Sequence, residues 1–186
     1  MTASTKIIRK LANPPKSAEP IPAAYLITFA IYGHHFHGDV MGSVDRDHNI
    51  PGTSRLPANP NRLRSEQARA RQESYTLDRK KRGLVLAAIR EVCTHRNWML
   101  RAAHVRSSHV HVVVSAEDAP ERVMQDFKAY ASRVLKRAGS GDANSKRWAR
   151  HGSTRYLWNP EQVGAAIHYV VREQGESMAV WEEESQ

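Results

Sequence analysis

Cysteine is nearly absent from this chain of 186 residues, in which Cys93 is the single example. A lone cysteine cannot form an internal disulfide, which excludes a disulfide-stapled secreted module and favours a reducing compartment. No apolar run approaches the roughly 20 residues of a membrane span, and the N-terminus lacks the apolar core of a secretion signal. We therefore expect a cytoplasmic protein that does not contact membranes.

Acidic residues are scarce in the middle of the chain. Residues 62–106 hold twelve Lys and Arg against four Asp and Glu, residues 122–155 hold nine against two, and the net charge is +9. Such a field attracts polyanions, and nucleic acid is the first candidate. The sign reverses near the C-terminus, where acidic residues gather.

Hydrophobic patterning predicts four strands and three helices. The expected strands cover residues 24–33, 98–106, 108–115 and 154–158, and the expected helices cover about 77–96, 120–136 and 160–173. Apolar residues follow a 3.6-residue spacing in the helices, while the first strand is apolar throughout. The order β-α-β-β-α-β-α predicts an α+β fold, a ferredoxin-like split βαβ with an added C-terminal helix.

We expect one folded domain with extensions. Residues 1–22, which contain four prolines, predict a flexible N-terminal arm, and the domain follows over residues 23–176. Within it, residues 34–76 form a long basic loop insertion without sustained periodicity, and loops of that length are usually functional. Residues 177–186 are expected to form an acidic tail.

Two histidines stand one residue apart in the strand expected at 108–115, which reads Ser-His-Val-His-Val-Val-Val-Ser. Side chains alternate along a strand, so His109 and His111 project to the same face. Two neutral imidazoles in this arrangement can bind a divalent cation and leave coordination positions open for water or substrate. The alternative is an alternating strand whose wetter face simply carries histidine.

Tyr169 is the candidate nucleophile on the last expected helix. Glu173 lies one turn further on the same face, so the two side chains can point at one site. A tyrosine hydroxyl has an ordinary pKa of about 10 and needs activation, which a nearby divalent metal supplies at a phosphodiester. The alternative is that Tyr169 is an amphipathic residue of the core. Tyr130, the other candidate, fits the apolar stripe of its own helix and is interpreted as core.

The pair His109-Val110-His111 in a hairpin, followed 58 residues later by Tyr169 on a helix, resembles the HUH single-tyrosine transposases of small insertion sequences. It is similar also to their relatives, the REP-associated tyrosine transposases. The resemblance spans residues 23–174, and the stretch Tyr-Leu-Trp-Asn-Pro at 156–160 is similar to the one preceding the family's nucleophile.

The resemblance implies a transposase that cleaves and rejoins single-stranded DNA near a hairpin. His109 and His111 would bind Mg²⁺ or Mn²⁺, and Tyr169 would form a 5′-phosphotyrosine intermediate. The family's third ligand is an amide four residues after the tyrosine, whereas Glu173 stands there and Gln174 follows. Regular helical geometry favours Glu173, and a local distortion would favour Gln174. Members occur as monomers and as dimers that exchange the tyrosine helix, so a homodimer is one option, and DNA binding would associate the protein with a bacterial nucleoid.

The sequence alone does not determine the roles of several further residues. Arginines that could track DNA phosphates are Arg62, Arg64, Arg79, Arg82, Arg133 and Arg137. His34, His35 and His37 are interpreted as facing DNA or incidental, and the facing direction of His104 depends on strand register. The alternatives in function are a DNA-binding repressor or host factor that has lost catalysis, and a metal-dependent RNA-processing enzyme or phosphodiesterase without a covalent intermediate.

Overall fold

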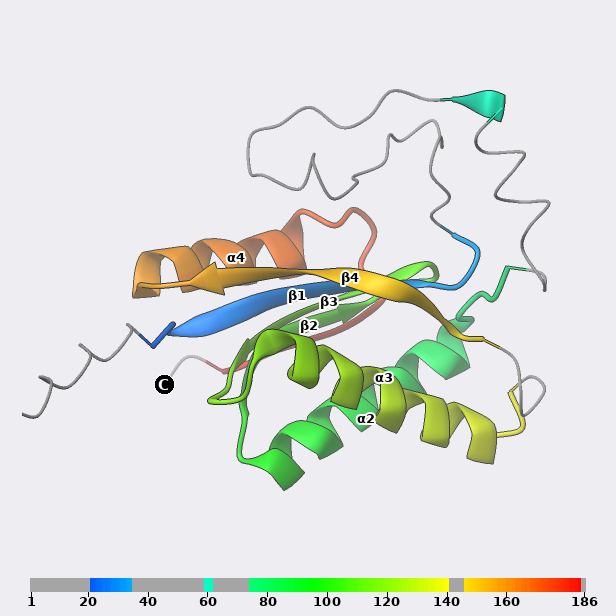
Figure 1. Ribbon diagram of the computed structural model, residues 1–186, viewed down its shortest axis with the longest axis horizontal. Helices are drawn as coiled ribbons and strands as arrows, with labels where there is room; N and C mark the ends of the chain where they lie inside the picture. The colour runs from blue at the N-terminus through cyan, green and yellow to red at the C-terminus, as the bar shows by residue number, and fades with distance from the viewer. Residues whose placement is uncertain (1–20, 35–58, 62–73, 141–145, 185–186) are drawn as a thin grey trace, which may run out of the picture.

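A computed structural model describes residues 21–34, 59–61, 74–140 and 146–184 of the chain (Figure 1). Eight helices and strands fall in this part: β1 Ala24–Ile31, α2 Arg79–Arg96, β2 Met99–Val105, β3 His109–Ser115, α3 Pro120–Arg137, β4 Trp148–Leu157, α4 Pro160–Arg172 and β5 Ala179–Glu182. The expected N-terminal arm and most of the expected loop insertion lie outside the described residues. Among the described helices, none has the length and apolarity to cross a membrane.

The strands form one antiparallel sheet in the order β4-β1-β3-β2-β5. The first four strands have the order of a split βαβ fold, so the predicted α+β class is confirmed. In the register, Thr28 of β1 and His104 of β2 both lie opposite His111 of β3. These three residues form a row across the middle of the sheet, on a single face.

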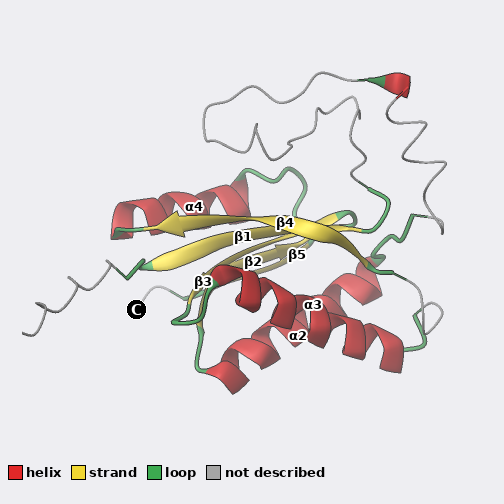
Figure 2. Cartoon of the chain, in the orientation of Figure 1, coloured by secondary structure: helices red, strands yellow, loops and turns green. Residues whose placement is uncertain are grey.

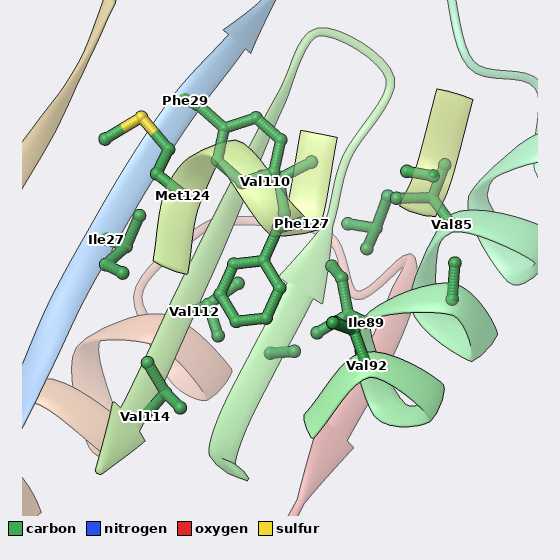
Figure 3. Close-up of a cluster of buried hydrophobic side chains, with 14 of the residues drawn as sticks. Ile27, Phe29, Val85, Ile89, Val92, Val110, Val112, Val114, Met124 and Phe127 are labelled. Atoms are coloured by element: carbon green, nitrogen blue, oxygen red, sulfur yellow. The ribbon is translucent and has the colours of Figure 1, made fainter. Parts of the chain in front are cut away.

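Helices α2 and α3 cover the other face of the sheet, as Figure 2 shows. The valines of β3 alternate with its histidines, and Val110, Val112 and Val114 pack against this helical layer. Figure 3 shows part of the resulting core, including Ile27, Phe29, Val85, Ile89, Val92, Met124 and Phe127. The alternation of one strand therefore directs three valines into the main core and leaves the two histidines, with Val113, on the opposite face.

Helix α4 lies on that opposite face (Figure 1). A smaller apolar cluster attaches it to the sheet through Ala166 and Val170 of the helix and Val113 of β3. The side chain of Asn159 caps the helix by accepting a hydrogen bond from the backbone N–H of Gln162. The helix begins at Pro160, as the expected range of 160–173 predicts, and proline suits this first position because its missing N–H is not needed there.

Two strands differ from expectation. β4 begins at Trp148 rather than at residue 154, and it is an outer strand whose polar side chains are largely exposed, which hides the alternation. β5 falls inside the segment expected as an acidic tail, where Val180 pairs with His104 of β2. A strand of four residues carries too short a pattern to be detected, and its partner is distant in sequence.

Candidate active site

The two histidines of β3 lie side by side on the face that α4 covers. The centroids of the His109 and His111 rings are 4.7 Å apart, and the ring planes are nearly perpendicular at 85°. The period of two residues along the strand produces this arrangement, as predicted. Ser108 places its hydroxyl 2.9 Å from Nδ1 of His109, so a neighbouring residue orients that ring.

His111 is buried, and its two nitrogens differ. Nδ1 lies 2.8 Å from Oγ1 of Thr28 on β1, whereas Nε2 is buried without a hydrogen-bond partner. Burial, together with a smaller effect of the neighbouring His109, lowers the pKa of His111 to about 3. The ring is therefore neutral, and a proton on Nδ1 donated to Thr28 leaves the Nε2 lone pair for a ligand.

Tyr169 lies over this pair. Its ring centroid is 5.9 Å from that of His111, with the two planes at 83°, and the side chain is 40% exposed. The tyrosine comes from α4 and the histidine from β3 of the same chain. A single chain thus brings a solvent-accessible phenol against a buried imidazole that has an unpartnered nitrogen.

Glu173 and Gln174 follow the last residue of α4, and their side chains make different contacts. The helix ends at Arg172, and Glu173 is its C-cap, with the backbone N–H bonded to the carbonyl of Tyr169. The Glu173 carboxylate accepts from Nδ1 of His168 at 2.9 Å, both side chains being exposed. Regular helical geometry, which favoured Glu173 over Gln174, does not extend to these two residues.

Gln174 lies on the side of the histidines. Its Nε2 donates to the Tyr169 carbonyl at 3.2 Å. The Gln174 side chain also raises the pKa of His111 against the larger effect of burial, which places the amide beside that ring, although Nε2 of His111 makes no regular hydrogen bond.

His104 of β2 and Arg106, which follows the strand, form hydrogen bonds with the segment that comes after Tyr169. Nδ1 of His104 donates to the carbonyl of Val170 at 3.0 Å, and Nε2 accepts from the backbone N–H of Met178 at 3.2 Å. The Arg106 guanidinium donates to the carbonyl of Gln174 and, at 3.1 Å, to that of Glu176. The direction of the His104 side chain depends on strand register, so it becomes visible only in the assembled sheet.

Comparison with known proteins assigns the chain to a family. The sequence profile described as "Transposase IS200 like" matches residues 68–161, half of the chain. The chain belongs to the IS200-like transposase family. The matched stretch includes His109 and His111 and ends before Tyr169. No curated protein matches the sequence.

Two solved structures are similar to this IS200-like transposase. One is described as the REP-associated tyrosine transposase bound to a REP hairpin, with 12% identity, a TM-score of 0.44, and coverage of 86% of this chain and 72% of that one. The other is described as a putative transposase from Deinococcus radiodurans R1, with 14% identity, a TM-score of 0.42, and coverage of 87% and 97%.

The four described arginines that were singled out in the transposase sequence lie on α2 and α3, the helices that cover the face of the sheet away from the histidines. Arg133 and Arg137 belong to α3, on the face of the sheet away from the histidines, and Arg133 packs over the Tyr130 ring at 4.1 Å. Arg79 and Arg82 lie in the first turn of α2. The backbone just before that turn bonds to the β2–β3 turn, from Leu77 N–H to the Ser107 carbonyl at 3.1 Å. Arg62 and Arg64 lie outside the described residues.

Tyr130 packs against the main core beneath the sheet, as predicted, and the sheet separates it from the histidine pair. His34 lies 3.1 Å from the Thr76 hydroxyl, and His35 and His37 lie outside the described residues. Across the residues the structure describes, no three His, Cys, Asp or Glu side chains group together as a metal site.

Proposed function

We propose that this transposase cleaves and rejoins single-stranded DNA at a hairpin-flanked site through a covalent bond to Tyr169. The observation that carries the proposal is the contact between the Tyr169 ring and His111, whose Nε2 is buried without a partner. A buried polar atom without a partner is costly and rare, and a ligand supplied by cofactor or substrate resolves it.

A divalent cation, Mg²⁺ or Mn²⁺, fits this donor set. His109 and His111 would hold it through neutral imidazole nitrogens. Gln174 is our preferred third ligand, because its amide lies beside His111 and its Oε1 suits a hard cation, while the Glu173 carboxylate is engaged by His168. When bound, the cation would stabilise the negative charge that develops on the phosphodiester oxygens.

In the proposed reaction the chain supplies the nucleophile, Tyr169. The Tyr169 oxygen attacks the phosphorus of the scissile phosphodiester, its proton passes to solvent, and the bond from phosphorus to the 3′ oxygen breaks. The 5′ phosphate is then held as a phosphotyrosine ester, and the leaving 3′ oxygen takes up a proton from solvent and becomes a free 3′-OH. Attack of a 3′-OH on this ester restores a phosphodiester and frees the tyrosine, so cleavage and joining are one reversible exchange.

Covalent adduct formation tests this function. Purified protein is mixed with Mn²⁺ or Mg²⁺ and end-labelled single strands that carry the inverted repeats flanking the gene. We expect a denaturant-resistant protein–DNA adduct that Tyr169→Phe abolishes and that the control Tyr130→Phe retains. An adduct that survives Tyr169→Phe would refute the assigned nucleophile, and cleavage without any adduct would favour a hydrolytic phosphodiesterase.

A further inference from the structure

Three buried polar atoms without hydrogen-bond partners gather where β1 ends and β4 begins. They are the hydroxyl of Tyr75 and the Nε atoms of Arg82 and Arg147. In the part of the chain that the structure describes, five buried side-chain atoms have no partner, and Nε2 of His111 at the proposed metal site is another of them. Native proteins leave few buried polar groups unsatisfied, so a concentration of them indicates groups that hold a ligand. We call these three side chains the arginine–tyrosine cluster.

Backbone hydrogen bonds bring the cluster together at one end of the sheet (Figure 1). The Tyr32 N–H, just after β1, donates to the Arg147 carbonyl at 2.9 Å, and the Tyr75 N–H donates to the Tyr32 carbonyl at 3.0 Å. The Arg147 guanidinium lies over the Tyr75 ring, with 6.0 Å from Cζ to the ring centroid. Two residues further along, the Leu77 carbonyl accepts from Nη1 of Arg82 at 2.9 Å. Both guanidinium groups therefore lie against the same short segment.

Arg147 is a buried charge. The residue is only 6% exposed, and its Nη2 donates to the Ser140 carbonyl at 3.1 Å. Among the described residues, neither Arg147 nor Arg82 forms an ion pair with a carboxylate. Arginine is almost never buried unless its charge is paired, because removing the charge from water is costly. An anionic ligand would supply both the opposite charge and the acceptor atoms.

The first turn of α2 adds positive charge beside the cluster. It reads Arg-Lys-Lys-Arg at residues 79–82 and contains no acidic residue. The N-cap Asp78 pairs with Lys81 at 3.2 Å, and Nζ of Lys81 lies 5.3 Å from the centroid of the Tyr75 ring. Cations are unfavourable at the N-terminus of a helix, where the macrodipole and the unpaired N–H groups favour anions. The sequence therefore concentrates positive charge where an anion would stabilise the helix.

The cluster lies at the same end of the sheet as the histidine pair, and the β2–β3 turn lies between them. The Leu77 N–H donates to the carbonyl of Ser107 in this turn at 3.1 Å, and His109 follows Ser108 directly. Tyr75 packs against the main core on the side that α2 covers, whereas the histidines face α4. The cluster is therefore separate from the proposed metal site.

We infer that the arginine–tyrosine cluster binds a phosphate group. Guanidinium groups present N–H donors in a fork that matches the oxygens of a phosphate, and the Tyr75 hydroxyl supplies a further donor. A backbone phosphate of bound DNA and free inorganic phosphate share this chemistry. The inference goes beyond the proposed function, because it assigns a binding site that takes no part in the reaction at the tyrosine.

Binding of inorganic phosphate tests the cluster directly. The full chain is titrated with sodium phosphate by isothermal titration calorimetry, without divalent metal and with chloride balancing the ionic strength. We expect saturable binding by the parent, which Arg147→Gln weakens by at least about tenfold. Tyr75→Phe should weaken it by about 3- to 10-fold. The matched control Arg150→Gln, an exposed arginine of β4, should bind phosphate like the parent.

Tyr75→Phe protects the test against a folding defect, because it removes a hydroxyl that has no partner in the protein. Its urea midpoint in chloride should be no lower than that of the parent. Added phosphate should raise the midpoint of the parent more than that of this variant. Equal phosphate affinity in Arg147→Gln and Arg150→Gln, full affinity in Tyr75→Phe, or a parent that binds no phosphate would each overturn the inference.

Oligonucleotides distinguish the two sources of the phosphate group. Every protein then carries Tyr169→Phe, and binding of a labelled DNA strand is measured without metal over a series of chloride concentrations. If DNA occupies the cluster, Arg147→Gln should bind the strand more weakly than the parent and reduce the salt slope by about one. If free phosphate is the ligand, Arg147→Gln should bind the strand like the parent despite its lost phosphate affinity. Either result supports the site and identifies its ligand.

Failure of the cluster and failure of the proposed function give different results. If Arg147→Gln loses phosphate binding but no Tyr169 adduct forms with metal, the cluster stands and the chemistry falls. If the adduct forms while Arg147→Gln binds phosphate like the control, the chemistry stands and the cluster falls.

Discussion

Nδ1 of His104 lies 3.0 Å from the carbonyl oxygen of Val170, the residue that follows Tyr169. The last four carbonyls of a helix have no partner within it, and Val170 is one of these in α4. His104 thus satisfies an orphan acceptor at the end of the helix that carries the proposed nucleophile. Its other nitrogen holds Met178, so one buried ring joins the helix, the turn after it and the sheet.

Replacing the His104 ring should destabilise the protein and the end of α4. His104→Phe keeps an aromatic volume but removes both hydrogen bonds, and each buried group left unsatisfied costs about 1–3 kcal/mol. We expect the free energy of unfolding in urea to fall by about 2–5 kcal/mol. Adduct formation should slow in native buffer. His95→Ala, on the exposed side of α2, should change stability by less than about 0.5 kcal/mol. Equal stabilities for the two variants would contradict this role.

Thr28 should matter to metal affinity although it touches no metal. Thr28→Val is nearly isosteric and removes the hydroxyl that orients Nδ1 of His111. Loss of such an outer partner typically weakens metal binding about 10- to 100-fold. Titration with Mn²⁺, followed by electron paramagnetic resonance, measures the change, and His111→Ala gives the value for a lost ligand. Unchanged Mn²⁺ affinity in Thr28→Val would rule out the orienting role.

The two candidate third ligands are separable by alanine substitution. Gln174→Ala should reduce the rate of adduct formation by at least about tenfold, since it removes the amide beside His111. Glu173→Ala breaks only an exposed contact with His168, so its effect should stay below about threefold. Single-turnover assays at saturating Mn²⁺ give both rates. The reverse ranking would make Glu173 the ligand.

A site complete within one chain predicts no complementation between chains. Tyr169 contacts His111 of its own chain, and the His104 and Arg106 bonds hold the tyrosine helix there. A mixture of Tyr169→Phe with the double variant His109→Ala, His111→Ala should therefore form no adduct. Adduct formed by the mixture would demonstrate a dimer that exchanges this helix.

Cys93 should be inert in the folded protein. Burial raises the pKa of its thiol to about 12 from the ordinary 9.0, and the thiolate is the reactive form. Alkylation by iodoacetamide at pH 8 should proceed only through unfolding and accelerate in urea. Because the unfolded thiol ionises first, stability should fall as the pH rises above 9. Rapid alkylation without urea would contradict the burial.

The sequence predicted what short periodic patterns encode. Alternation placed His109 and His111 on one face, and the Asn-Pro pair at 159–160 marked the start of α4. The predicted end of α4 at residue 173 lies one residue beyond the observed end at Arg172, and the preference for Glu173 over Gln174 depended on regular helix continuing through both residues. The direction of the His104 side chain depends on β-sheet register, and the formation of β5 depends on pairing between segments distant in sequence. These features arise from tertiary contacts.

The position of β3 in the middle of the sheet has a consequence for how this protein diversifies. The histidines sit on the innermost strand, flanked by β1 and β2, where backbone amides exchange most slowly and substitutions are least tolerated. The outer strand β4 is largely exposed and borders only β1. Substitutions along β4 should therefore cost less stability than substitutions along β3, so variation between related sequences is expected to gather on the outer strand.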